Sequence, residues 1–233
     1  MSGGTPSGVT GPDPAVGGQG RSATAQAAAN SVDRLTFFSD AVVAIAMTLL
    51  ALDLPVPNVD SGPGLAEFVG DHLGEYLAFL ISFLVIAAYW RAHHQLYRYV
   101  TDAPPHVVTL TIYWLLTVVV TPYATRVLYG GQDISHSDFP WRFSFYALVQ
   151  AFAALTFFLA QSYLEQQALL APETPPGLLQ RGRVRNLLLM SLFGVSIPLA
   201  FAIHGWAFVA WGLIPVARRL VEAFVRRRHP GAR

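Results

Sequence analysis

The sequence predicts an all-α membrane protein with six transmembrane helices per chain. Hydrophobic residues make up 53% of the 233 residues and charged residues only 12%, about half the charged share of soluble domains. The apolar residues gather into six segments that Pro, Gly and polar residues separate. Arginines lie mostly at alternate ends of these segments, as expected for a chain whose cytoplasmic loops are positively charged.

Composition also excludes several classes of protein. The formal net charge is +1 and Cys is 0. A near-balance of charge argues against a nucleic-acid binder, and the absence of Cys excludes a disulfide framework, a thiolate metal site and a Cys nucleophile. The sequence holds no P-loop, Ser–His–Asp set or GxSxG elbow. We therefore expect no enzyme activity, no cofactor and no nucleic-acid partner.

The two ends of the chain differ from its centre. Gly, Ser, Pro, Thr and Ala dominate residues 1–31 without an apolar period, and such a segment cannot bury enough surface to offset its ordering entropy. It also lacks the basic start and apolar stretch of a signal peptide. The sequence therefore predicts a disordered cytoplasmic tail over 1–31, a six-helix transmembrane domain over 32–228 and a short cytoplasmic tail over 229–233.

The first four apolar segments are bounded by helix-breaking residues. They run over about 34–54, 72–99, 106–129 and 139–163, and prolines at 55, 57, 104 and 105 and glycines at 130 and 131 separate them. A bilayer core of ~30 Å needs ~20 apolar residues in a helix. The second, third and fourth segments meet this length, whereas the first has a shorter uncharged run over 41–52.

The last apolar stretch fits two spans better than one. A single helix over 187–217 would be ~46 Å long at ~1.5 Å per residue, which is too long for one span without strong tilt. Gly205 offers a break. We therefore expect a fifth helix over about 187–204 and a sixth that begins after Gly205 and ends among the arginines at 218–228.

The distribution of arginines supports six spans with both termini in the cytoplasm of a multi-pass cell-membrane protein. Only Arg126 and Arg142 would then lie at outer ends. The arginines at cytoplasmic ends would be Arg34, Arg91, Arg98, Arg181, Arg183, Arg185, Arg218, Arg219, Arg226, Arg227 and Arg228. This is a strong positive-inside bias, which a five-span chain would break. The outer segments are acidic, which fits either plain solvated loops or a face that concentrates cations.

The first apolar segment carries a regular stripe of side chains. Ile45, Thr48, Leu49 and Leu52 follow i, i+3, i+4, i+7 spacing and fall within ~100° of a helical wheel. The stripe could pack on neighbouring helices. It could instead line the axis of a symmetric oligomer, where apolar rings can gate by dewetting and Thr48 hydroxyls can replace part of an ion's hydration shell. Asp40 lies ~140° from Ile45 on the same wheel and would point away from that axis.

Three motifs resemble those of one known family. The run from Arg34 to Asp40, RLTFFSD, resembles the RxxxFSD signature that begins helix one in the transmembrane-protein-175 family of potassium channels. The run Trp90-Arg91-Ala92-His93 is similar to the family's Trp-x-x-His at the end of helix two. Thr121-Pro122-Tyr123 is similar to the Pro-aromatic pair late in helix three. The six-helix layout is similar to the single repeat of prokaryotic members, and the resemblance covers about residues 32–226.

The resemblance implies a homotetramer with a central pore that the first helix lines. By position, Ile45 matches the family's narrow hydrophobic constriction, Thr48 the hydroxyl layer tied to selectivity, and Leu49 and Leu52 further apolar rings. The residues matching the network that holds the helix are Arg34, Phe38, Ser39, Asp40 and His93. Thr111 stands where the family pattern leads us to expect Asn.

The resulting expectation is a passive, potassium-selective leak channel with a hydrophobic gate, whose partners are K⁺, the lipid bilayer and copies of itself. One alternative is a proton-conducting or proton-coupled transporter, although the first helix has no ionisable residue between Asp40 and Asp53 to form a carboxylate relay. Another is a non-conducting scaffold whose Arg-rich tail binds anionic lipid. A flux assay with ion substitution separates the three.

Overall fold

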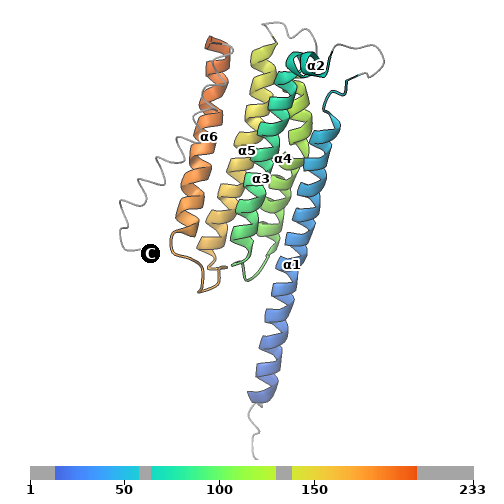
Figure 1. Ribbon diagram of the computed structural model, residues 1–233. Helices are drawn as coiled ribbons and strands as arrows, with labels where there is room; N and C mark the ends of the chain where they lie inside the picture. Colours follow the sequence, from blue (N-terminus) through green and yellow to red (C-terminus); the bar gives the residue numbers. More distant parts are fainter. Residues whose placement is uncertain (1–13, 58–63, 130–137, 204–233) are drawn as a thin grey trace, which may run out of the picture.

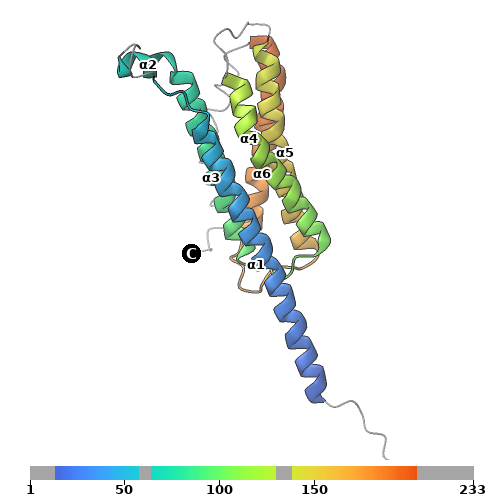
Figure 2. The same ribbon diagram turned by 90° about the vertical axis from the view of Figure 1, so that its right-hand side faces the viewer.

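A computed structural model describes residues 14–57, 64–129 and 138–203, which form an all-α bundle (Figure 1). The helices are α1 (Pro14–Leu52), α2 (Leu65–Asp71), α3 (Leu73–Tyr97), α4 (Pro105–Tyr129), α5 (Phe139–Gln166) and α6 (Leu178–Ile203). The long helices lie side by side, and the short α2 extends sideways from one end of the bundle (Figure 2). The all-α prediction is therefore confirmed for the described residues.

Five of the helices are long and apolar enough to cross a membrane. These candidate spans are Ala25–Leu52, Leu73–Tyr97, Pro105–Tyr129, Phe139–Gln166 and Leu178–Ala202. They correspond to the first five predicted segments. The predicted sixth span, which begins after Gly205, lies outside the described residues, as do residues 1–13 and the tail over 229–233.

Two helices begin earlier in the structure than the sequence predicts. Residues 14–31, predicted to be disordered, are helical and extend α1 well beyond the bundle (Figure 1). The Ala-rich run over 23–29 has high helix propensity, and it adds turns to an existing helix without a new nucleus. α6 begins at Leu178, shortly after Pro175 and Pro176, whereas the apolar segment was predicted from 187. The prediction missed the first turns of α6 because they are mostly polar.

The centre of the bundle is α4 and α5. About half of the apolar window of each is buried, 50% and 56%, whereas α1, α3 and α6 bury 28% or less. α6 packs on α5, and α1 and α3 pack on α4. Small side chains are fully buried in α4 and α5, among them Ala124, Ala147 and Ala154. In a membrane the hydrophobic effect does not drive helices together, and small residues allow the close packing that holds them instead.

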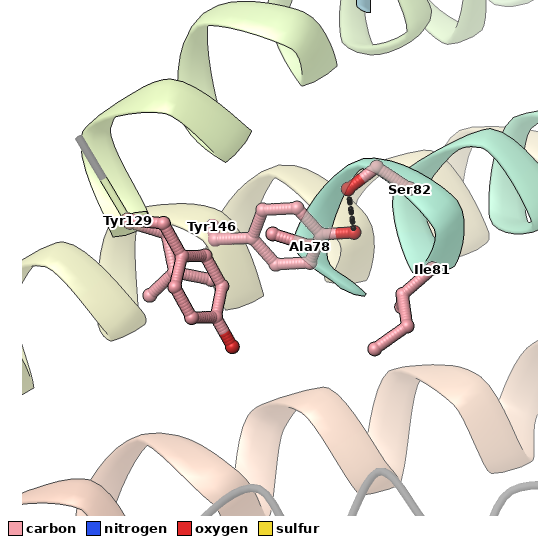
Figure 3. A pocket seen from close by; sticks show the side chains of 6 residues that line it. Ala78, Ile81, Ser82, Tyr129 and Tyr146 are labelled. Atoms are coloured by element: carbon pink, nitrogen blue, oxygen red, sulfur yellow. Dashed lines mark hydrogen bonds between the residues drawn. The ribbon is translucent and has the colours of Figure 1, made fainter. Parts of the chain in front are cut away.

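Buried hydroxyls link α3, α4 and α5. The Ser82 hydroxyl lies 3.1 Å from the Tyr146 hydroxyl and 2.8 Å from the Thr125 hydroxyl. The Gln150 amide donates to the Thr121 hydroxyl at 3.2 Å. Ser82 and Tyr146 also line a small pocket with Ala78, Ile81, Leu128 and Tyr129, and Figure 3 shows their hydroxyls facing one another. Interhelical hydrogen bonds of this kind set how apolar helices rotate against one another.

Gly182 allows α6 to approach α5, and this leads to the first prediction. A Cβ at Gly182 would clash with Nε2 of Gln161. The Gln161 side chain is buried, and its Oε1 accepts a 2.8 Å hydrogen bond from the Asn186 amide. Gly182→Ala should lower the free energy of unfolding by about 1 kcal/mol, because displacing a buried hydrogen bond costs ~1–3 kcal/mol and exceeds the helix-propensity gain of ~1 kcal/mol.

A thermal unfolding series in detergent tests this, with Gly194→Ala as the matched control. Gly194 lies in the same helix, and a methyl group there would meet no atom of the described residues within 4 Å. The control should therefore be neutral or stabilising. Equal melting temperatures for the two variants would contradict a close-approach role for Gly182.

Candidate functional site

The functional surface predicted from sequence lies on α1, which has two unlike faces. One face carries Val32, Leu35, Val43, Ala46 and Leu50, which are all buried in the main apolar core. Ser39, which is also buried, lies between Leu35 and Val43. The buried positions therefore follow one another at steps of three or four residues, as in a helical stripe. The elements that cover this stripe are α3 and α4. α1 therefore has a fixed rotation about its axis, and its remaining face points away from the bundle.

The predicted pore-lining residues occupy that uncovered face. Ile45 is 60% exposed, Leu49 41% and Leu52 79%, and Thr48 between them is also exposed. α1 lies at one side of the bundle (Figure 1). The structure thus brings the four residues together on one accessible surface, and packing among the described helices does not explain the stripe.

Thr48 gives this surface a defined polar atom. Its hydroxyl donates to the Ile45 carbonyl, one turn earlier, at 2.8 Å. Because a Thr hydroxyl has one proton and two lone pairs, that bond uses the proton and leaves oxygen lone pairs for another group. The exposed face therefore presents apolar side chains and one oxygen that can accept a hydrogen bond or contact a cation.

Asp40 connects α1 to α3 at the other end of the stripe. The Trp90 indole Nε1 donates to the Asp40 carboxylate at 2.8 Å, and the Trp90 ring stacks on His94 with centroids 5.5 Å apart. The pair links the RxxxFSD run to the Trp-x-x-His run, although the two are 50 residues apart in the sequence. This contact holds the carboxylate on the side of α1 away from Ile45.

Three other residues assigned to this network, Arg34, Phe38 and Ser39, form no side-chain hydrogen bond to another described helix. Ser39 is fully buried, but its hydroxyl donates to the Leu35 carbonyl of its own helix at 2.8 Å. Arg34 and Phe38 are exposed. Within the part of the chain that the structure describes, Arg34 forms no ion pair. Asp40 is the network residue of α1 whose side chain is hydrogen-bonded to another described helix, through Trp90 of α3.

His93 lies in the aromatic centre of the bundle. It is 1% exposed and stacks between Tyr97, at 3.9 Å, and Trp114, at 4.8 Å. Neither ring nitrogen has a hydrogen-bond partner among the described residues. Thr111, where the family pattern suggests Asn, is hydrogen-bonded to the Tyr97 hydroxyl at 2.5 Å. In the described part of the chain, His93 packs against aromatic rings of α3 and α4.

The contacts at the Leu52 end of α1 were not anticipated from sequence. The Asp53 carboxylate forms an ion pair with Arg126 of α4, whose Nη1 donates a hydrogen bond to it at 3.2 Å. The Tyr76 hydroxyl donates to the Pro55 carbonyl at 2.9 Å. Asp53 and Arg126 are 73 residues apart. The signal that could have found the pair is the position of both residues at one end of neighbouring spans.

The Asp40–Trp90 bond leads to the second prediction. Trp90→Phe keeps an aromatic ring that can stack on His94 but removes the indole donor. We expect a loss of about 1 kcal/mol in the free energy of unfolding, below the ~1.5–3 kcal/mol of a buried charge-assisted bond, because Trp90 is 38% exposed. Thermal unfolding with Asp40→Asn and the double variant measures the coupling. A double variant whose loss equals the sum of the two single losses would contradict a direct interaction.

The sequence of this chain is similar to those of several known proteins. The family model described as "Endosomal/lysosomal potassium channel TMEM175" matches residues 34–122. A protein named a potassium channel from Streptomyces collinus is 33% identical over 207 residues, which are 83% of this chain and 98% of that protein. A chicken protein named endosomal/lysosomal proton channel TMEM175 is 31% identical over 136 residues, 55% of this chain and 26% of its own.

A solved structure shares the fold. The crystal structure described as a lysosomal potassium-selective channel TMEM175 homolog from Chamaesiphon minutus superposes with a TM-score of 0.62 at 23% identity. The superposition covers 82% of this chain and 96% of that one. The helical arrangement built above is therefore that of a known fold over almost the whole of the solved chain.

Proposed function

This chain belongs to the TMEM175 potassium-channel family, and we propose that it forms a homotetrameric channel that conducts K⁺ passively through a pore lined by α1. The proposal includes a cell-membrane location with both termini in the cytoplasm. Family membership favours a channel over an enzyme. The relatives named potassium channels support K⁺ as the permeating ion.

The observation that carries the proposal is the uncovered face of α1. Ile45, Leu49 and Leu52 are large apolar side chains that the described part of their own chain leaves exposed. Lipid could cover such a face, but the free lone pairs of the Thr48 oxygen are better matched by ions and water than by lipid. A central axis of four chains accounts for both the apolar residues and the hydroxyl, because it holds ions and water.

In this arrangement the four copies of each residue form successive layers. A ring of Ile45 side chains makes a narrow apolar neck, where water and ions are disfavoured. The Thr48 hydroxyls lie one turn further along α1 and offer oxygen lone pairs to an ion that has lost part of its hydration shell. Leu49 and Leu52 complete the apolar lining toward the Asp53 end. A small rotation or tilt of α1 would widen the neck.

Proton permeation is a second candidate, which the name of the chicken relative favours. The uncovered face has no ionisable side chain between Asp40 and Asp53, so protons would need a water wire rather than a relay of carboxylates. A non-conducting scaffold is less supported, because it gives no reason for the polar layer at Thr48. Measurement of flux separates these functions.

The test is ion flux in liposomes that contain the purified protein. Vesicles loaded with K⁺ are diluted into Na⁺ buffer, and proton uptake is followed with a pH-sensitive dye with and without a protonophore. A potassium pore should give uptake only with the protonophore, which balances the charge of K⁺ efflux. Uptake without it would indicate proton permeation. Absence of flux from inserted, tetrameric protein would contradict the channel proposal for the resting state.

A further inference from the structure

An ion pair lies directly beyond the exposed stripe of α1. α1 ends at Leu52, and Asp53 is the next residue. Its carboxylate lies 3.2 Å from Nη1 of Arg126, on the last turn of α4. The Asp53 side chain is 35% exposed and that of Arg126 is 70% exposed. The pair is therefore accessible to water at the end of α1 where Leu52 lies.

The position of the pair matters because charges at a pore mouth act on ions from a distance. Asp53 directly follows Leu52, which is the last residue of both the stripe and α1. Exposed charges influence ions over the Debye length, ~10 Å at 0.1 M salt and ~30 Å at 0.01 M. A mouth that carries one sign of charge raises or lowers the local concentration of cations.

We propose that Arg126 sets the cation concentration at the mouth of the pore by neutralising Asp53. The inference rests on the proposed function, since it assumes that α1 lines the pore. In a tetramer the four pairs would place four carboxylates and four guanidinium groups around the Leu52 end, with charges that cancel. Loss of either partner leaves four uncompensated charges there.

A purely structural role for the pair makes a different prediction. A clamp between α1 and α4 is broken equally by removing either partner, so both single variants would change conduction in the same direction. An exposed ion pair contributes little to stability, and the Tyr76–Pro55 bond at 2.9 Å still holds this end of α1. An electrostatic role instead requires the two variants to act in opposite directions and to depend on salt.

The experiment is a measurement of single-channel K⁺ conductance for Arg126→Gln, Asp53→Asn and the double variant, in ~10 mM and ~1 M KCl, where the Debye lengths are ~30 Å and ~3 Å. At low salt we expect Arg126→Gln to raise conductance about twofold or more and Asp53→Asn to lower it by about the same factor. Both effects should nearly vanish at high salt. The double variant should conduct like the unaltered protein.

A second ion pair gives a matched control. Arg183, near the start of α6, and Glu165, on the last turn of α5, form a 2.5 Å contact. The connection between α5 and α6 lies at the opposite end of the bundle from α2, the helix that follows α1 (Figure 1). Glu165→Gln and Arg183→Gln should leave conductance unchanged. Effects of the same sign at Asp53 and Arg126, or effects that persist in ~1 M KCl, would overturn the inference alone. An unaltered protein that carries no K⁺ current would overturn the proposed function and this inference with it.

Discussion

Replacing Ile45 with Asn should raise potassium conductance about tenfold or more, since a barrier lowered by ~1.4 kcal/mol corresponds to a tenfold rate. Four copies of the side chain would share that change, so each needs to contribute only ~0.35 kcal/mol. An apolar constriction opposes ions because it dewets, whereas an amide of similar size can hydrogen-bond water. Ile45 is exposed in the single chain, so the substitution should not disturb the core.

Single-channel recording of the reconstituted variant checks this result, and α5 offers a matched control. Leu148 is 56% exposed, close to the 60% of Ile45, and lies on a helix that does not line the proposed pore. Leu148→Asn makes a comparable exchange of an exposed apolar side chain for an amide. It should leave conductance unchanged. An Ile45→Asn channel that conducts like the unaltered protein would contradict the assignment of the neck.

Local sequence signals predicted the bounds of the spans well where breaking residues stand at their ends. The third segment, predicted over 106–129, is α4, Pro105–Tyr129, because prolines precede it and glycines follow it. The same reasoning failed over 14–31, where the composition resembles a flexible tail but the chain continues an existing helix. Apolar periodicity describes what a segment can bury, and it misses polar turns that extend a helix into water.

Part of the candidate site could likewise be predicted from local sequence, and part could not. The spacing of Ile45, Thr48, Leu49 and Leu52 was sufficient to predict one face of a helix, because that is a property of a single segment. Whether that face is covered depends on how α3 and α4 pack against α1. The spacing of residues within α1 carries no information about this packing. The bonds of Asp40 to Trp90 and of Asp53 to Arg126 span 50 and 73 residues, and they follow from the packing of whole helices.

The second large effect is expected at Thr48. Thr48→Val replaces the hydroxyl with a methyl group of similar size and should lower the preference for K⁺ over Na⁺ about fivefold, which corresponds to ~1 kcal/mol. Among the described residues the hydroxyl bonds the Ile45 carbonyl of its own helix, so its loss should leave the packing of α1 intact. The reversal potential with K⁺ on one side of the membrane and Na⁺ on the other measures the ratio.

Thr48→Ser keeps the oxygen and serves as the control, so its ion preference should stay close to that of the unaltered protein. Comparison with Ile45→Asn then separates the two layers of the proposed pore. If the neck limits the rate and the hydroxyls discriminate between ions, Ile45→Asn should raise conductance while it retains K⁺ preference, and Thr48→Val should lose preference without a comparable gain in conductance. A Thr48→Val channel with unaltered preference would show that the ions are selected elsewhere along α1.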